Sequence, residues 1–283
     1  MSILNADLHC HSVVSDGTLT PEELASRAAA NGVQLWSLTD HDEVSGQQRA
    51  AAAARAHGMK YLTGAEISVT FAGETVHIVG LGFDADDPAM REGLLQTRGG
   101  RQERAREIAE GLRQAGIKDA YDGALKYVGN PELISRTHFA RFLVDSGICS
   151  NTGDVFRRFL THGKPGYVPH RWASLCDAVG WITRAGGVAV VAHPGRYAFT
   201  ANEEYALFIE FKAHGGTGVE VVTGSHTTAE YVKYADTARE FGLAASRGSD
   251  FHDPGESRID LGELPYLPGE LTPVWELLTD RIR

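Results

Sequence analysis

Apolar positions in the first third of the chain fall into short runs, each followed by a stretch with the spacing of an amphipathic helix. The first helix is expected to begin at Thr20-Pro21-Glu22-Glu23, because the threonine cap and the glutamate three residues later satisfy free backbone amides. The same alternation returns after Ser174. Strands are expected over residues 3–9, 33–39, 61–68, 75–83, 188–192, 218–222 and 243–247, with a turn at Ala72-Gly73-Glu74 joining 61–68 to 75–83. Strands that alternate with helices predict parallel β-structure and, in a chain of 283 residues, a barrel-like α/β fold.

The middle of the chain has a different pattern. Between about residues 84 and 168 the apolar spacing is helical almost throughout, and no strong strand run interrupts it. This predicts a barrel domain formed by residues 1–83 and 169–283, with a helical insertion over residues 84–168. The insertion is expected to lie close to the site, as a cap that recognises substrate.

Histidines and carboxylates recur at the ends of the expected strands. In Asp7-Leu8-His9-Cys10-His11, strand alternation directs Asp7 and both histidines to one side, where two imidazoles can hold a divalent ion. Asp250 and His252 repeat this spacing near the other end of the chain. The remaining candidates are Asp16, Asp40, His41, Glu66, His77 and His193. Because active sites of α/β barrels lie at the carboxyl ends of the strands, we expect these residues to converge on a metal site.

Composition narrows the class of protein. The chain has 27 basic and 37 acidic residues and a net charge of -10, which argues against nucleic-acid binding through bulk electrostatics, and no DNA partner is expected. Three cysteines without paired spacing predict no disulfide framework. The sequence shows neither a signal-peptide pattern nor a run of membrane-spanning length. We therefore expect a cytoplasmic protein with no membrane partner.

Four motifs resemble those of the polymerase and histidinol phosphatase (PHP) family of metal-dependent phosphoesterases. They are Asp7-x-His9-x-His11, Thr39-Asp40-His41, Ala192-His193-Pro194 and Ser249-Asp250-Phe251-His252. The resemblance implies a distorted seven-stranded β/α barrel, similar to a TIM barrel, that holds two or three divalent ions: manganese first, with zinc or iron as alternatives. The implied ligands are His9, His11, Glu66 and Asp250 for a first ion, Glu66, His77 and His193 for a second, and Asp16, His41 and His252 for a third. Some relatives have histidine in place of Asp16; the carboxylate makes the third site richer in oxygen and favours manganese.

The expected chemistry is hydrolysis of a phosphoester. Two ions bridged by a carboxylate hold a hydroxide and lower the pKa of its parent water, and this hydroxide attacks phosphorus. No protein nucleophile is needed, so Cys10 is expected to serve packing. Glu66 and Asp250 are the expected catalytic residues, and Asp40 either positions a ligand or handles a proton. The general acid stays open.

Helix starts and basic residues in and beside the insertion are expected to bind a second phosphate. A helix N-terminus presents free amides to an anion, and Gly100-Arg101-Gln102 and Ser135-Arg136 both lie at expected helix starts. Lys164 and Arg196 complete this set. A solvated helix face is expected for Arg104, Arg106 and Arg113. Tyr127, Tyr167 or Tyr197 either stacks on a base or serves packing. A surface or capping role is expected for His57 and His214, and a structural role for His138, His162 and His170.

Within the family, a chain of this length with a helical insertion resembles the nucleotide-directed branch. This implies removal of the 3′-phosphate of nucleoside 3′,5′-bisphosphates, such as adenosine 3′,5′-bisphosphate, to give AMP. The alternatives are a 5′-to-3′ exoribonuclease acting on short RNA, a histidinol phosphate phosphatase, and a metal-binding module without catalysis. A nucleic-acid-binding module is disfavoured by the net charge and by the absence of a basic aromatic platform.

Overall fold

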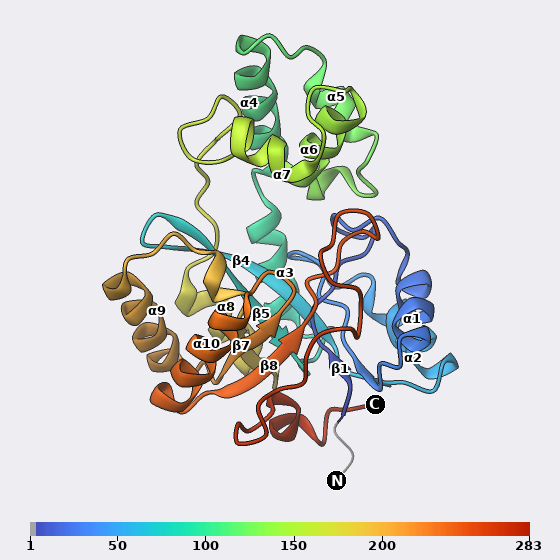
Figure 1. The fold of residues 1–283 in the computed structure, drawn as a ribbon, viewed down its shortest axis with the longest axis vertical. Coiled ribbons are helices and arrows are strands. Elements are labelled where there is room, and N and C mark those ends of the chain that lie inside the picture. Colours follow the sequence, from blue (N-terminus) through green and yellow to red (C-terminus); the bar gives the residue numbers. More distant parts are fainter. Residues whose placement is uncertain (1–3) are drawn as a thin grey trace.

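The computed structural model describes residues 4–283 and shows a mixed α/β protein (Figure 1). Its strands are β1 (Ala6–Asp7), β2 (Leu35–Trp36), β3 (Lys60–Tyr61), β4 (Gly64–Phe71), β5 (Glu74–Leu81), β6 (Val188–Val191), β7 (Gly218–Thr223) and β8 (Ala244–Gly248). Its α-helices are α1 (Pro21–Ala30), α2 (Gln47–Ala56), α3 (Pro88–Arg98), α4 (Arg101–Gln114), α5 (Ala120–Leu125), α6 (Arg136–Asp145), α7 (Thr152–Val155), α8 (Leu175–Arg184), α9 (Ala201–Ala213) and α10 (Thr228–Phe241). Shorter helical turns are η1 (Pro131–Leu133), η2 (Phe156–Leu160), η3 (Pro194–Arg196) and η4 (Val274–Leu278). The strand expected over residues 3–9 shortens to β1, and residue 3 lies outside the described residues.

The strands form two sheets. Strands β1, β2 and β3 run parallel in the smaller sheet, whereas in the larger sheet β5 runs antiparallel to both β4 and β6. The prediction of parallel strands is therefore wrong for β5. The cause is the tight turn between β4 and β5, where Ala72 and Gly73 adopt φ values of 48° and 82°. Such a two-residue turn reverses the chain and joins antiparallel neighbours.

Backbone hydrogen bonds link the two sheets. The Leu8 N–H donates to the carbonyl oxygen of Arg247 at 3.0 Å, which joins the end of β1 to β8. Isolated parallel bridges pair Cys10 with Phe251 and His41 with Glu66. Two linked sheets of three and five strands thus stand, within residues 4–283, where a closed seven-stranded barrel was expected. The links bring together the strand ends that carry the histidine motifs.

Helices cover both sheets on their outer faces (Figure 1). Phe208 of α9 and Ala238 of α10 pack into the larger core, and Leu24 of α1 packs near Trp36 in the smaller one. Leu94 of α3 also belongs to the larger core, so α3 packs with the sheets rather than with the helices that follow it. The helix start at Thr20 has the expected capping box. Among residues 4–283, no helix is long and apolar enough to cross a membrane.

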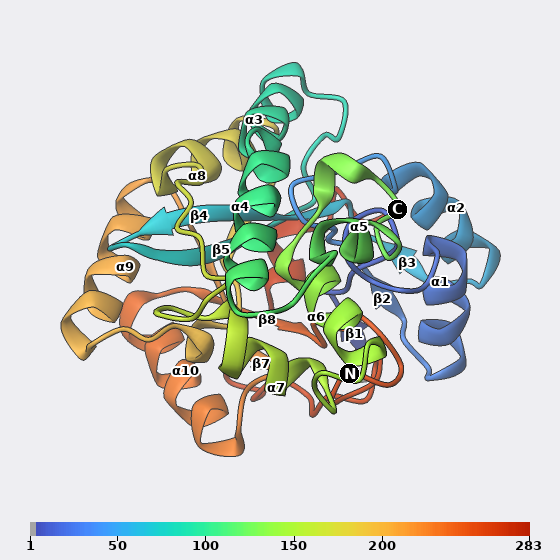
Figure 2. The same cartoon turned by 90° about the horizontal axis from the view of Figure 1, so that it is seen from above.

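Helices α4 to α7 have a core of their own. It includes Ile108 and Leu112 of α4 and Phe139 and Leu143 of α6. In Figure 1 these helices stand apart from the sheets, and the view from above in Figure 2 places α4 and α6 over the region where the strands end. The helical segment therefore lies above one end of the sheets, where it can close over a site formed by the strand ends.

Candidate metal centre

All nine expected ligands come together below helices α4 and α6. They form four groups, and the potential ligand atoms of each group lie within 4.8 Å of one another. The groups are His11, Asp16, His41 and His252; His9, Glu66 and His193; His9, His11 and Asp250; and His41, Glu66 and His77. Members that belong to more than one group join them into a single centre.

Glu66, on β4, lies in the middle of this centre. Its side chain is fully buried, and its two carboxylate oxygens face five imidazole rings from four other segments of the chain. The distances from Oε1 are 2.9 Å to His77 Nδ1, 2.9 Å to His193 Nε2 and 3.3 Å to His9 Nε2, and those from Oε2 are 2.9 Å to His41 Nδ1 and 3.3 Å to His11 Nε2. This geometry suits a carboxylate that bridges ions.

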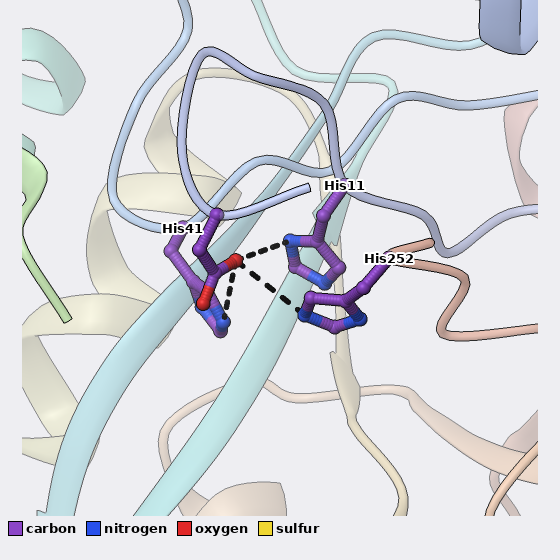
Figure 3. Close-up of side chains that lie close together, drawn as sticks. His11, His41 and His252 are labelled. Atoms are coloured by element: carbon purple, nitrogen blue, oxygen red, sulfur yellow. Dashed lines mark ion pairs between the residues drawn. The ribbon is translucent and has the colours of Figure 1, made fainter. Parts of the chain in front are cut away.

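A second carboxylate, Asp16, faces another set of rings. Figure 3 shows His11, His41 and His252 with ring nitrogens directed toward one carboxylate oxygen. This oxygen is Asp16 Oδ1, which lies 3.9 Å from His11 Nδ1, 3.8 Å from His41 Nε2 and 3.4 Å from His252 Nε2. His41 thus presents one ring nitrogen to Asp16 and the other to Glu66.

The donor atoms fit divalent ions. Within residues 4–283, five of the atoms that face the centre are buried without a hydrogen bond of good geometry: His11 Nδ1, Asp16 Oδ1, His41 Nδ1, Glu66 Oε2 and His77 Nδ1. Buried polar atoms are normally satisfied, so a cluster of free lone pairs calls for a cation. Imidazole nitrogens and carboxylate oxygens are ligands of manganese, zinc and iron.

The charges in the centre favour ionised carboxylates. Burial alone would raise the pKa of Glu66, but the surrounding rings, His77 first, hold that pKa well below its usual range. Burial opposes protonation of His9, yet the carboxylates of Glu220, Glu66 and Asp250 together hold the pKa of this ring well above its usual value. A buried set of ionised carboxylates that raises the pKa of a neighbouring ring is an environment that attracts cations.

Two motif carboxylates, Asp7 and Asp40, bind backbone and hydroxyl groups instead. Asp40 accepts hydrogen bonds from the Ser12 N–H at 2.7 Å and from the Ser15 hydroxyl at 2.6 Å. Asp7 accepts one from the Ser249 N–H at 2.9 Å. Both therefore shape segments that lead directly to candidate ligands. Of the two roles expected for Asp40, this geometry fits the positioning of a ligand.

A cavity of about 110 Å³ opens from the centre toward the helical segment. Arg101 and Arg104 of α4 and Arg136 of α6 line it, and Trp172 forms one wall. The guanidinium carbons of Arg101 and Arg104 lie 4.5 and 5.2 Å from the centroid of the Trp172 ring, within the range of cation–π attraction. Phe156 lines the same cavity. Its position next to the metal ligands makes it the candidate substrate pocket.

Two of these arginines lack a counter-ion. Within residues 4–283, Arg104 and Arg136 donate only to main-chain carbonyls, of Val168 at 3.1 Å and Leu160 at 3.4 Å. Burial, followed by repulsion from Arg136 and Arg101, lowers the pKa of Arg104 to about 9. Removing these guanidinium groups from water without an anionic partner costs free energy, which a bound anion would offset.

Arg104 is also the clearest correction to the sequence analysis. We expected it on a solvated helix face, but only 8% of its surface is exposed, and it belongs to the buried stripe of α4. The same expectation is confirmed for Arg106 and Arg113, which lie exposed and pair with Glu103 and Glu110.

The other expected phosphate contacts divide into two sets. Ser135, Arg136, Arg101 and Arg196 line the cavity, whereas Gly100, Gln102 and Lys164 do not. Arg101 pairs with Asp42, and Arg196 pairs with Asp250 at 2.7 Å. Trp172 and Phe156 supply the aromatic surface in place of Tyr127, Tyr167 and Tyr197. Sequence reasoning missed both aromatic residues, because nothing local distinguishes them from core residues.

The unassigned histidines have structural contacts. His57 and His214 are the C-caps of α2 and α9, as expected. His138 completes a capping box at the start of α6, where its Nδ1 accepts the Ser135 N–H at 2.9 Å. The neutral ring needed for this contact is consistent with burial, which lowers the pKa of His138 to about 4.

The fold and this histidine- and carboxylate-rich centre are those of a metal-dependent hydrolase of phosphoesters. Residues 7–92 match the model of the PHP domain, and the chain belongs to the PHP family. A 3′,5′-nucleoside bisphosphate phosphatase from Chromobacterium violaceum is 52% identical over 278 residues, which cover 98% of each chain. A 5′-3′ exoribonuclease from Haemophilus influenzae is 44% identical over 270 residues, 95% of this chain and 97% of the relative. The solved structure of an amidohydrolase from Chromobacterium violaceum superimposes with a TM-score of 0.96 at 52% identity, covering 99% of this chain and 97% of the other.

Proposed function

We propose that this protein is a metal-dependent phosphatase that removes the 3′-phosphate of nucleoside 3′,5′-bisphosphates. The observation that carries the proposal is a pair of arginines, the buried Arg104 and the half-buried Arg136, which have no counter-ion among residues 4–283 and line the same small cavity as the candidate ligands. A nucleoside bisphosphate can present one phosphate to the candidate metal ligands and the other to these two arginines. The 52% identity to a 3′,5′-nucleoside bisphosphate phosphatase supports the same substrate class.

We keep the division of the ligand set that the family resemblance implies, whereas the groups of neighbouring ligand atoms in the structure place His193 with His9 and His77 with His41 around Glu66. We assign His9, His11, Glu66 and Asp250 to a first ion, Glu66, His77 and His193 to a second, and Asp16, His41 and His252 to a third. Bound divalent ions lower the pKa of a coordinated water and neutralise charge on the phosphoryl oxygens. Manganese suits the oxygen-containing third group, and zinc or iron are the alternatives. We further propose that the two linked sheets correspond to the distorted barrel of the family. The cytoplasmic location of the protein stays a prediction.

The chain itself contributes the binding and orientation of the substrate. Arg136 and Arg104 hold the phosphate that is not cleaved, and the faces of Trp172 and Phe156 are available to the sugar or base. This arrangement places the 3′-phosphate over the candidate ligands. All acidic residues that line the cavity belong to the ligand set, so a cationic amino alcohol such as histidinol phosphate finds no further carboxylate there.

The test compares two substrates in arginine variants. Arg136→Ala and Arg104→Ala should each lower kcat/KM for adenosine 3′,5′-bisphosphate by roughly ten- to a hundredfold, because a charge-assisted hydrogen bond contributes about 1.5–3 kcal/mol. Turnover of an aryl monophosphate, which lacks the second phosphate, should change much less. Arg113→Ala, on the exposed face of α4, is the matched control. Equal losses on both substrates would contradict the assignment of these arginines.

A second cavity favours short RNA as an additional substrate. This cavity of about 330 Å³ shares Phe156, Asp250 and His252 with the first and continues toward Ser225 and Arg258. The Ser225 hydroxyl is buried without a hydrogen-bond partner. In a 5′-phosphorylated RNA, the phosphoryl group on the first 3′-oxygen carries the next nucleotide, so hydrolysis of the same bond requires space on this side of the centre.

This alternative has its own experiment. The wild-type protein should cleave a 5′-phosphorylated dinucleotide, and Arg258→Ala should lower the ratio of its kcat/KM for the dinucleotide to that for adenosine 3′,5′-bisphosphate. Arg258 is exposed and lines only the second cavity. A wild-type protein inactive on the dinucleotide would exclude the exoribonuclease function and leave the phosphatase proposal intact.

A further inference from the structure

A buried carboxylate outside the PHP motifs touches two of the candidate ligands. Glu220 lies in the interior of β7, and only 1% of its surface is exposed. Its Oε1 lies 2.7 Å from His9 Nδ1, and its Oε2 accepts a hydrogen bond of 2.6 Å from the backbone N–H of His193. Within residues 4–283, no lysine or arginine forms an ion pair with Glu220. Burial of a carboxylate away from lysine and arginine costs free energy, which argues that Glu220 is kept for its contacts with the site.

The contact between Glu220 and His9 determines which nitrogen of the His9 ring carries a proton. A carboxylate accepts hydrogen bonds, so His9 must carry a proton on Nδ1 toward Glu220. In the neutral ring this leaves the lone pair on Nε2, which faces Glu66 at 3.3 Å and Asp250 at 3.5 Å. Histidine ligands of metals are commonly oriented in this way by an acceptor on the second ring nitrogen.

The contact with His193 holds the backbone in a strained conformation. His193 has a φ of 27° and a ψ of 57°, close to the left-handed region that side-chain-bearing residues rarely adopt. The hydrogen bond from its N–H to Glu220 fixes the turn that directs the ring to Glu66, 2.9 Å away. Strained residues of this kind persist where surrounding contacts hold them.

We propose that Glu220 is a positioning residue that prepares two ion sites at once, through the ring of His9 and the backbone of His193. This role of Glu220 rests on the metal assignment proposed above, in which His9 belongs to the first ion site and His193 to the second. The third group, His41, Asp16 and His252, has no contact with Glu220, so its ion should be independent of this residue.

Glu220→Gln tests this with nearly the same shape. An amide has one acceptor oxygen and one donor nitrogen, so it cannot accept from both groups. If its oxygen serves the His193 N–H, its nitrogen faces His9 Nδ1 and forces the proton onto Nε2, the nitrogen that must bind the ion. If its oxygen serves His9, the amide nitrogen faces the His193 N–H, and two donors oppose each other.

The readouts are metal content and ring tautomer. After dialysis against buffer with limiting manganese, the wild-type protein should retain ions at the first two sites, and Glu220→Gln should bind them roughly ten- to a hundredfold more weakly. Nitrogen-15 spectra of the metal-free proteins, recorded at a pH high enough to make the His9 ring neutral, should show His9 protonated on Nδ1 in the wild type and on Nε2, or mixed, in the variant. Turnover of the variant should recover with excess manganese, at an unchanged KM for substrate. Glu210→Gln, an exposed change of the same type on α9, is the control.

The possible outcomes distinguish an error in the metal assignment from an error in the role of Glu220. A wild-type protein without bound metal would overturn the metal assignment itself. A folded Glu220→Gln protein with wild-type metal retention and an unchanged His9 tautomer would overturn the role of Glu220 alone. If Glu220→Gln does not fold, Glu220→Asp keeps both acceptors on a shorter side chain, and should retain the Nδ1 proton on His9 but bind the ions more weakly. Wild-type retention by that aspartate variant would then overturn the positioning role.

Discussion

The guanidinium of Arg141 donates a hydrogen bond of 2.7 Å to the main-chain carbonyl oxygen of Asp16. Arg141 lies on α6, and Asp16 belongs to the third group of candidate ligands. At the start of the same helix, the Ser135 hydroxyl donates to Asp16 Oδ2 at 3.2 Å. Helix α6 and its capping residue Ser135 therefore hold both the backbone and the side chain of Asp16, a candidate ligand. Arg136, which we assign to substrate binding, begins that helix, so substrate contacts and the third ion site share one element.

We expect Arg141→Ala to weaken binding of the third ion. The change removes the Asp16 contact and also breaks the pairing of Arg141 with Glu256, whose carboxylate accepts two hydrogen bonds of 3.0 Å. Glu256→Ala is the matched control, because it removes the ion pair but keeps the contact to Asp16. Metal analysis should show fewer ions per chain for Arg141→Ala than for Glu256→Ala. Equal metal contents would show that the hydrogen bond to Asp16 has no role in retaining the ion.

Glu66→Gln and Asp250→Asn should lower turnover by roughly a hundredfold or more while the fold persists. Glu66 faces rings of all three proposed ion sites, so its neutral amide should disturb more than one ion. Asp250 Oδ1 lies 3.3 Å from His11 Nε2 and 3.5 Å from His9 Nε2, and should affect chiefly the first ion. Metal analysis beside steady-state kinetics on adenosine 3′,5′-bisphosphate distinguishes the two. Near-normal turnover in either folded variant would refute its assignment.

Short sequence patterns were sufficient to locate the candidate ligands. Strand alternation placed His9 and His11 on one side, and their rings do lie together, with centroids 5.2 Å apart. The capping box at Thr20 and the helix start at Ser135 were also visible, because each depends on residues only a few positions apart. Features that depend on local geometry and on strand ends are therefore predictable from sequence.

The partners of buried charges were harder to predict. Arg104 follows Arg101 by three positions and precedes Ile108 by four, the spacing of one helix face, so its burial could have been inferred. Glu220 interrupts an otherwise apolar strand, which is also a recognisable signal. The pairing of Glu220 with His9 could not be inferred, because it depends on how β8 connects β7 to the segment that follows β1, far apart in sequence. The turn at Ala72-Gly73-Glu74 between two strands was predictable from these local residues, whereas the antiparallel pairing of β5 with β6 was not.

His138 should make the protein less stable in acid. In the folded protein burial lowers the pKa of His138 from 6.5 to about 4, so the unfolded chain takes up this proton first as the pH falls. The unfolding free energy should therefore be fully present above pH 6.5, decrease between pH 6.5 and 4, and lose about 3 kcal/mol from this group in all. His138→Gln keeps an acceptor at the third helical position and should lose correspondingly less. Urea titrations of both metal-free proteins at several pH values measure the difference, and identical pH profiles would contradict it.

Removal of the ions should lower the melting temperature. Within residues 4–283, the metal-free centre leaves Glu66 Oε2 and Asp16 Oδ1 buried without hydrogen-bond partners, and ions bound only to the folded chain relieve this cost. A ligand at a hundred times its dissociation constant stabilises the folded state by about 2.7 kcal/mol, which corresponds to roughly 5–10 °C for a domain of this size. Calorimetry with and without chelator tests the expectation, and returning manganese should restore the original melting temperature.

Hydrogen exchange should show whether the helices above the centre respond to the ions. Because Arg141 connects α6 to Asp16, chelation should expose amides of α6 to exchange before those of α9, which packs on the core of the larger sheet. Equal hydrogen exchange in α6 and α9 after chelation would mean that the stability of α6 does not depend on the bound ions.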